Sequence, residues 1–294
     1  MTRPQDLVLE LADELAATGV PSPGADARWL VAHAVGVDLG QLFLRPELTD
    51  DEIGRARELA SRRAEGEPVQ HITGEAPFRF ETLRVGPGVF VPRPETELVA
   101  GRAIEILAER TPERRRVVEP CAGSGAISRA IVRELGHVEA YANERSPRAL
   151  DYLYENLRDT DVRVVPGDFR TALTALSGRA DVVVCNPPYV PETVRASLPA
   201  DVVGRDPDEA LFAGPDGLAV IRDLHVVAAA LLRADGWLVT EHDESHQEQV
   251  VNLLVDAGWQ EVVAHRDLTG RPRFVEARWP GGPPATRWQD GARE

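Results

Sequence analysis

The sequence predicts an α/β fold: a doubly wound, mostly parallel, seven-stranded sheet with a small N-terminal helical domain. Two observations lead to this prediction. From residue 116 onward, short apolar segments typical of strands alternate with helical segments, the order expected when helices connect parallel strands. Before about residue 66, the apolar residues repeat only at helical spacing. We therefore expect a helical domain (1–67), a hairpin linker (68–91), a sheet domain (92–280) and a flexible tail (281–294).

The helical domain is predicted from three segments separated by turn signals. Leu7, Leu11 and Leu15 repeat every fourth residue, and a second apolar segment around residues 29–34 follows a Pro- and Gly-rich turn. Thr49-Asp-Asp-Glu52 has the form of a capping box, so a third helix is expected to start there and run to about Ala64.

A β-like pattern between Phe78 and Val91, centred on Gly86-Pro87-Gly88, predicts a hairpin that turns at these residues. The strands expected beyond it are 116–119, 138–142, 162–165, 180–185, 236–241, 261–265 and 273–277. Gly270-Arg-Pro272 separates the last two closely enough for them to pair as an antiparallel hairpin.

The composition limits the function classes. No stretch has the length and apolarity of a membrane span, the first residues do not resemble a signal peptide, and two cysteines are too few for a disulfide framework. We therefore expect a cytoplasmic protein without a membrane partner. All 33 cationic residues are arginine, which excludes lysine nucleophiles, and the net charge of −15 disfavours tracking along nucleic acid. A negative charge suits a cationic cofactor or a basic protein partner.

Asn186-Pro187-Pro188-Tyr189 follows the apolar strand 180–185 and is the strongest functional signal. Proline fixes φ and removes N–H donors, so this segment is stiff and rich in acceptors. The Asn186 side-chain oxygen and the Pro187 carbonyl would each accept one hydrogen of a flat NH₂ group, and the Tyr189 ring would cover its plane. A glutamine amide, adenine or cytosine carries such a group.

A nucleotide-type cofactor is predicted at the carboxyl ends of the first three strands, where open α/β sheets bind ligands. Cys121-Ala122-Gly123-Ser124-Gly125 is a glycine turn that lets a ligand approach the backbone. Glu144, 19 residues after Gly125, would accept both hydroxyls of a ribose. Asp168 and Phe169 would hold an adenine by a hydrogen bond and a ring contact.

A dinucleotide cofactor would use the same glycines and the same acid. Three features favour S-adenosylmethionine. Glu119 places an acid near the cationic methionine end, the glycine pattern is shorter than Gly-x-Gly-x-x-Gly, and the Asn-Pro-Pro-Tyr site faces the position of a sulfonium methyl group.

Together these segments resemble the HemK/PrmC family of release factor glutamine methyltransferases. The resemblance includes Val91-Pro-Arg93-Pro-Glu95-Thr96-Glu97 and the segment 209–218, Glu-Ala-Leu-Phe-Ala-Gly-Pro-Asp-Gly-Leu. It implies a seven-stranded S-adenosylmethionine-dependent methyltransferase sheet, and methyl transfer to the side-chain nitrogen (N5) of the glutamine in the Gly-Gly-Gln motif of peptide chain release factors. It also implies that Arg93, Glu95 and Thr96 line the mouth of the cofactor and substrate pockets, that Asn186 touches both ligands, and that residues 1–67 help to bind the release factor. No metal and no direct nucleic-acid partner are expected.

Two departures from the family pattern leave alternatives open. Cys121 stands where the family usually has glycine, and Arg145 follows the ribose acid where an apolar residue is usual. A diverged paralogue that acts on another amide, or one that only binds the cofactor, remains an alternative. A nucleic-acid amino methyltransferase would share Asn-Pro-Pro-Tyr, although the sequence offers no basic target-recognition domain for it.

Two further features are given other interpretations. His242 and His246 are spaced for one helix face, but a zinc protease needs Glu directly after the first His, so we expect a solvated helix start. Cys121 and Cys185 end neighbouring predicted strands and would border the site as reduced core residues. Their oxidation to a disulfide that distorts the cofactor turn is a hypothesis for thiol counting to test.

Overall fold

A computed structural model describes residues 2–197 and 206–282 and divides them into two units. Residues 2–75 and 85–87 belong to the first unit, and residues 76–84, 88–197 and 206–282 belong to the second. The tail predicted over residues 281–294 lies outside the described residues from residue 283 onward.

The first unit is helical, and its main helices are α1 (Pro4–Ala17), α2 (Pro23–Val35) and α3 (Asp50–Ala64). Leu7, Leu11 and Leu15 are buried on one face of α1 and pack with α2 into one core. The predicted capping box is present at α3: Thr49 Oγ1 accepts from Glu52 N, and Glu52 Oε2 accepts from Thr49 N at 2.8 Å. The structure adds α4 (Val69–Thr73), which the sequence pattern does not predict because five residues are too few to show a period.

The hairpin differs from its prediction. The strands are β1 (Glu75–Phe78) and β2 (Glu81–Arg84), so the chain turns at Arg79-Phe80, and Gly86-Pro87-Gly88 follows the second strand. Arg79 supplies the positive φ of this turn, 52°, which a pattern based on glycine overlooks. Its guanidinium bonds to the carboxylate of Glu134, which belongs to the second unit, as Arg79 does.

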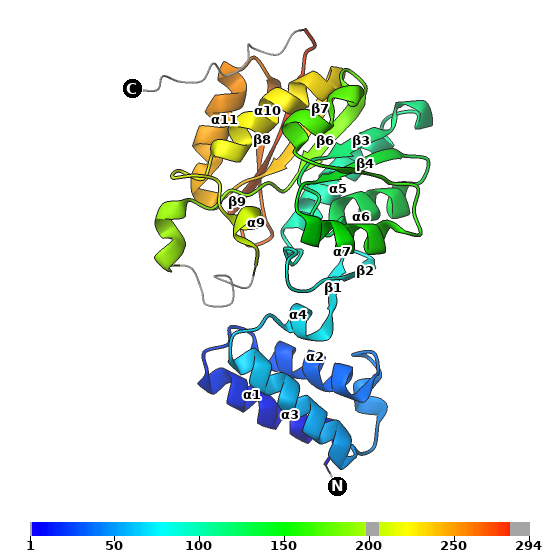
Figure 1. The fold of residues 1–294 in the computed structure, drawn as a ribbon, viewed down its shortest axis with the longest axis vertical. Coiled ribbons are helices and arrows are strands. Elements are labelled where there is room, and N and C mark those ends of the chain that lie inside the picture. Colours follow the sequence, from blue (N-terminus) through cyan, green and yellow to red (C-terminus); the bar gives the residue numbers. More distant parts are fainter. Residues whose placement is uncertain (1, 198–205, 283–294) are drawn as a thin grey trace. The chain divides into compact units, whose positions relative to one another are not determined.

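The second unit is built on the predicted seven-stranded sheet, in the order β5-β4-β3-β6-β7-β9-β8 (Figure 1). β3 to β7 are parallel, and β9 pairs antiparallel with both β7 and β8, which confirms the expected last hairpin. The strands are β3 (Arg116–Glu119), β4 (Glu139–Glu144), β5 (Arg163–Pro166), β6 (Ala180–Cys185), β7 (Leu232–Glu241), β8 (Gln260–Arg266) and β9 (Pro272–Trp279).

The largest boundary difference is at β7, which begins at Leu232 instead of Gly236. The register between β6 and β7 shifts between Ala180 and Val182, and Asp235 takes a positive φ of 64°. Because of this irregularity the strand begins with polar residues, and a search for apolar segments does not detect its first part.

Helices cover both faces of this sheet. Alternate strand residues point to opposite faces, so Val182 and Val184 of β6 pack with α5 and α6, whereas Val183 and Cys185 pack with α10. The helices are α5 (Thr96–Ala108), α6 (Ala126–Leu135), α7 (Pro147–Leu157), α8 (Phe169–Ala172), α9 (Asp208–Leu211), α10 (Ala219–Leu231) and α11 (Gln247–Asp256). Short 3₁₀ turns lie at Leu42–Leu44, Pro112–Arg114, Thr174–Leu176, Glu192–Ser197 and Glu244–His246.

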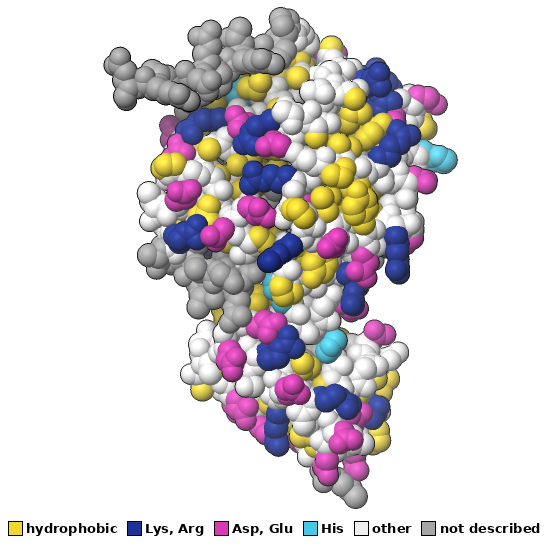
Figure 2. All heavy atoms as spheres, viewed as in Figure 1, with side chains coloured by type: hydrophobic (Ala, Val, Ile, Leu, Met, Phe, Trp, Pro, Cys, Tyr) yellow, Lys and Arg dark blue, Asp and Glu magenta, His cyan; other side chains and the backbone are white. Residues whose placement is uncertain are grey.

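Charged side chains on the face drawn in Figure 2 lie interspersed, acidic next to basic. Many arginines of the described residues form ion pairs with acids; Arg129, for example, pairs with Glu81 and Asp159 at 2.5 and 2.6 Å. None of the described helices has the length and apolarity needed to cross a membrane.

Candidate active site

A cavity of about 260 Å³ lies at the carboxyl edge of the sheet, within the second unit. The ends of β3, β4, β5 and β6 all contribute to it, which is where ligands bind in open α/β sheets. It is lined by most of the predicted site residues: Arg93, Thr96, Glu119, Cys121, Ala122, Gly123, Ser124, Glu144, Phe169, Asn186, Pro187, Pro188 and Tyr189.

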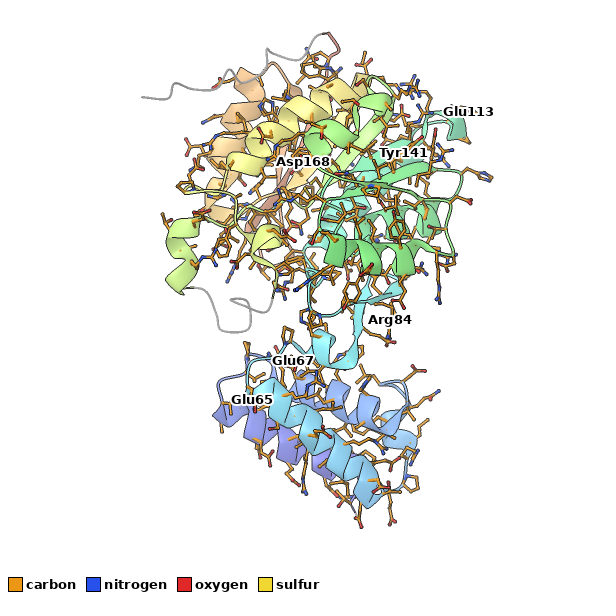
Figure 3. All side chains as sticks on the ribbon, viewed as in Figure 1. Glu65, Glu67, Arg84, Glu113, Tyr141 and Asp168 are labelled. Carbon is orange, nitrogen blue, oxygen red and sulfur yellow. The ribbon has the colours of Figure 1, made fainter. Side chains whose placement is uncertain are left out.

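The lining differs from the prediction at three positions. Gly125, Glu95 and Asp168 are not among the residues that line the cavity. Asp168, labelled in Figure 3, caps α8 by accepting from Arg170 N, and its carboxylate pairs with the Arg170 side chain at 2.9 Å. A short acidic side chain at a helix N-cap bonds its own backbone, and here that competes with a ligand role.

The glycine turn after β3 is held by its neighbours on both sides. Ala122 N donates to the Asn143 carbonyl at 2.8 Å, and Asn156 Nδ2 donates to the Ser124 carbonyl at 2.9 Å. A side chain at Gly125 would come within 2.7 Å of Leu153 Cδ1, so this glycine serves close packing of the turn on α7. Cys121 takes φ +57°, the left-handed conformation that glycine adopts without strain.

Glu144, at the end of β4, is buried and holds the turn in place. Its Oε2 accepts from Gly123 N at 2.9 Å, and its Oε1 accepts from Arg145 N and Ser146 N. A carboxylate has about four acceptor positions, so these three bonds leave roughly one for a ligand hydroxyl. Glu144 therefore keeps an acceptor position for a ribose hydroxyl, and its contact with both hydroxyls stays a prediction.

Glu119, the last residue of β3, is 2% exposed and lines the cavity. Burial raises the pKa of its carboxyl to about 8, although Ser128 N donates to Oε2 at 2.8 Å. Burial disfavours the charged form of this acid, and a nearby cation favours it. Glu119 is thus suited to the ammonium or sulfonium end of a cofactor.

Asn186 and Tyr189 are fixed by a chain of hydrogen bonds that ends on one carboxylate. Asn186 Nδ2 donates to Thr96 Oγ1 at 3.1 Å, and Thr96 Oγ1 donates to Glu241 Oε2 at 2.7 Å. Tyr189 OH donates to Glu241 Oε1 at 2.9 Å. Burial raises the pKa of Glu241 to about 7. The sequence does not predict Glu241 as a site residue, because its position beside the end of β6 follows only from the pairing of β6 with β7.

The segment 209–218 supports the Asn-Pro-Pro-Tyr loop through backbone bonds. Val190 N donates to the Leu211 carbonyl at 2.8 Å, and Ala213 N donates back to the Val190 carbonyl at 3.0 Å. A side chain at Gly217, whose φ is +73°, would overlap the Tyr189 carbonyl oxygen. The Asn-Pro-Pro-Tyr loop and the segment 209–218 therefore form one structural unit.

Arg93, which lines the cavity, takes part in an ion pair that the sequence does not predict. Arg93 Nη2 lies 2.8 Å from Asp206 Oδ2, and the guanidinium stacks on the Phe90 ring, 5.2 Å from its centre. Phe90 and Pro207 line the cavity beside Arg93.

The histidines and cysteines have the following environments. His242 and His246 are buried, not solvated as predicted, because they pack behind the end of β7 and the Gly217 loop. Over residues 2–197 and 206–282, no three His, Cys, Asp or Glu side chains are grouped as a metal site requires.

The two cysteines lie close together. The Cys185 thiol donates to the Pro120 carbonyl, and its pKa is raised mainly by burial and further by the adjacent Cys121. Both thiols are free, and the oxidation hypothesis stays a prediction.

Comparisons with known proteins agree with this geometry. Residues 6–74 match the family model described as PrmC N-terminal domain, and residues 72–201 match one described as Conserved hypothetical protein 95. The release factor glutamine methyltransferase of Streptomyces coelicolor is 42% identical over 272 residues, 92% of this chain and 96% of that protein. This chain belongs to the release factor glutamine methyltransferase family. The family member from Deinococcus radiodurans is 40% identical over 282 residues, 95% of this chain and 99% of its own.

A solved structure supports the fold. The hMettl16 catalytic domain gives a TM-score of 0.51 at 17% identity, covering 79% of this chain and 82% of that one. The predicted sheet of the methyltransferase type and the family resemblance are both confirmed.

Proposed function

We propose that this chain transfers a methyl group from S-adenosylmethionine to the side-chain amide nitrogen (N5) of the glutamine in the Gly-Gly-Gln motif of peptide chain release factors. Membership of the release factor glutamine methyltransferase family supports the proposal. The observation that carries it is the direction of the hydrogen bond from Asn186 Nδ2 to Thr96, which turns the NH₂ group of Asn186 toward Thr96 and leaves Oδ1 as an acceptor.

The cavity fits the proposed cofactor by the chemistry of its walls. The glycine turn exposes backbone, Glu144 retains an acceptor position, and Glu119 is a buried acid without a cationic partner in the described part of the chain. When bound, S-adenosylmethionine supplies a methyl group activated by a sulfonium. Glu119 would balance the charge of its methionine end, and Phe169 would pack against its base.

The polar groups after β6 suit a weak nucleophile. An amide nitrogen is a poor nucleophile because its lone pair is delocalised, so the residues must act by orientation. Asn186 Oδ1 and the Pro187 carbonyl would accept its two hydrogens, Tyr189 would cover its plane, and Pro188 would keep the loop rigid. Arg93 and Glu95 would contact the release factor near the mouth.

We also propose that residues 1–67 contribute to binding of the release factor and that the protein acts in the cytoplasm. The charge pattern supports a protein acceptor over a nucleic acid. The net charge is −15, and Figure 2 shows acids next to the arginines on the face that it draws, whereas nucleic-acid binding needs a basic surface.

A methyl-transfer assay with labelled S-adenosylmethionine tests the proposal. We expect label on the motif glutamine of a release factor, none on a Gly-Gly-Ala version, and a loss of about 100-fold or more in kcat for Asn186→Ala. Equal labelling of the Gly-Gly-Ala version would point to another acceptor. Label on added RNA or DNA, with none on the release factor, would favour the nucleic-acid alternative.

A further inference from the structure

We propose that Glu241 is a positioning residue that sets which way the Asn186 amide faces and holds the Tyr189 ring. This inference rests on the proposed function and deepens it. Glu241 does not line the cavity, so it acts through Thr96 and Tyr189, not on a ligand.

The fold brings these four side chains together from three elements. Cys185 of β6 is paired in register with Thr240 of β7, so the residues that follow, Asn186 and Glu241, lie at the same sheet edge. Thr96 is the first residue of α5, which packs on both strands. Thr96 and Glu241 are 4% and 1% exposed, so water does not compete for their hydrogen bonds.

The direction of each hydrogen bond follows from the carboxylate. An ionised carboxylate only accepts, so the single hydrogen of Thr96 Oγ1 points to Glu241. Thr96 Oγ1 then offers Asn186 only a lone pair, which an NH₂ group can use and a carbonyl oxygen cannot. The amide of Asn186 is thereby fixed with Nδ2 toward Thr96, and Oδ1 is left for the substrate.

Without an acceptor-only partner, this direction is lost. Thr96 could then donate to Asn186 Oδ1, and the amide would turn so that its NH₂ faces the cavity. Two NH₂ groups, one from Asn186 and one from the substrate glutamine, would oppose each other with no acceptor between them. The substrate would lose one of the two bonds proposed to aim its nitrogen.

The second oxygen of Glu241 acts on Tyr189 in the same way. The phenol hydrogen points to Oε1, which fixes the far end of the ring, while the Tyr189 carbonyl packs against Gly217. Both side chains proposed to contact the substrate amide besides the Pro187 carbonyl, those of Asn186 and Tyr189, are therefore oriented by one carboxylate.

A purely structural role would not require a charge here. Burying a carboxylate with two hydroxyl donors costs free energy, and an amide or apolar side chain would fill the same space at lower cost. The nearby cation, Arg273, forms its ion pair with Asp267 at 3.2 Å. The ionised carboxyl is better explained by the direction that it gives to its hydrogen bonds.

Glu241→Gln tests the inference because it keeps the shape and replaces one acceptor with a donor. We expect kcat to fall by about 100-fold, with the Kd for S-adenosylmethionine within about twofold of wild type and an unchanged melting temperature to within a few degrees. Glu248→Gln, on the exposed side of α11, is the matched control and should leave kcat unchanged.

Substitutions at Thr96 separate the effect of its hydrogen bonds from the effect of its side-chain volume. Thr96→Val removes the hydroxyl and should lower kcat as Glu241→Gln does, while Thr96→Ser should recover most of the rate lost in Thr96→Val. Because the two residues act through one chain, the double variant Glu241→Gln/Thr96→Val should be about as slow as either single variant.

The NMR signal of the Asn186 side-chain NH₂ decides the inference without any methyl transfer. In wild type it should exchange slowly with solvent, as expected for an amide bonded to Thr96, and the signal is assigned by its loss in Asn186→Ala. Glu241→Gln should shift it and speed its exchange.

The two proposals fail differently. An unchanged kcat together with an unchanged NH₂ signal in Glu241→Gln would overturn the inference. A wild-type protein that methylates no release factor would overturn the proposed function, and the NH₂ comparison would still decide whether Glu241 directs Asn186.

Discussion

The end of β6 and the end of β3 face the same cavity, but they handle buried polarity differently. At the end of β6, Asn186, Thr96, Tyr189 and Glu241 form a connected set of hydrogen bonds in which each donor has one partner. At the end of β3, Glu119 is buried with one backbone donor, and its pKa is raised to about 8. The hydrogen bonds at the β6 end fix the orientation of Asn186 and Tyr189, whereas the acid at the β3 end can become charged when a cation binds. The difference teaches that the ends of two neighbouring strands can orient a substrate and balance the charge of a cofactor in one cavity.

The largest effect is expected where the β6 end depends on a glycine. Gly217→Ala would place a methyl group on the Tyr189 carbonyl oxygen at a position with φ +73°. The loop carrying Asn186 and Tyr189 must then move, so we expect kcat/KM for the release factor to fall by more than about 100-fold, since a shift of about 1 Å costs that much.

Gly214→Ala is the matched control for this substitution. Gly214 also has a positive φ, +79°, but an added Cβ would meet only Ala219 Cβ at 3.4 Å. It should cost about 1 kcal/mol of stability and little activity. Equal losses for the two variants would show that backbone strain, and not the overlap with Tyr189, is the cause.

A change of pH should separate the two ends. Burial raises the pKa of Glu241 to about 7, against hydrogen bonds from Thr96 and Tyr189 and the charge of Arg273, while Glu95 adds to the rise. Since the ionised form is the one that directs Asn186, kcat at saturating cofactor should fall by about tenfold per pH unit below 7. The profile of Glu241→Gln should be flat, and an identical slope in both proteins would contradict this role.

The β3 end should respond to pH through cofactor affinity. Burial raises the pKa of Glu119 to about 8, so the free site is mostly protonated at pH 7, and a bound cation favours its ionised form. Binding of S-adenosylmethionine should therefore release a proton, and its affinity should rise with pH up to about 8. Calorimetry in buffers of different ionisation enthalpy measures the release.

Glu119→Gln is the control for proton release. It should abolish the release and weaken binding by about tenfold at pH 8, because the charge that balances the cation is gone. Proton release that persists in Glu119→Gln would assign it to another group.

The contrast between the strand ends also explains what the sequence could predict. Asn186-Pro187-Pro188-Tyr189 and the glycine turn are local signals, since each follows an apolar strand directly, and their position at the sheet edge follows from the parallel order. Glu241 bonds to Thr96 and Tyr189 behind the cavity wall, and nothing adjacent to it in sequence marks it. Its role depends on the pairing of β6 with β7, which is tertiary information.

The errors have similar physical causes. The hairpin turns at Arg79, a non-glycine residue with positive φ, so the glycines at 86 and 88 misled the prediction. The start of β7 is hidden by a register shift, and α4 is too short to show a period.

The smallest effect is expected at Cys121, in the turn at the β3 end. Its φ of +57° strains any residue with a Cβ, by about 1 kcal/mol or more. Cys121→Gly and Cys121→Ala both remove the sulfur, so the difference between their free energies of unfolding reports the strain of the backbone conformation. We expect the glycine variant to be the more stable by about 1 kcal/mol in the free energy of unfolding from denaturant titration. At Ala130, in the interior of α6, the order should reverse, with glycine less stable than alanine by about 1 kcal/mol. If alanine were also the better residue at position 121, the turn would not be strained, and the β3 end would tolerate cysteine without cost.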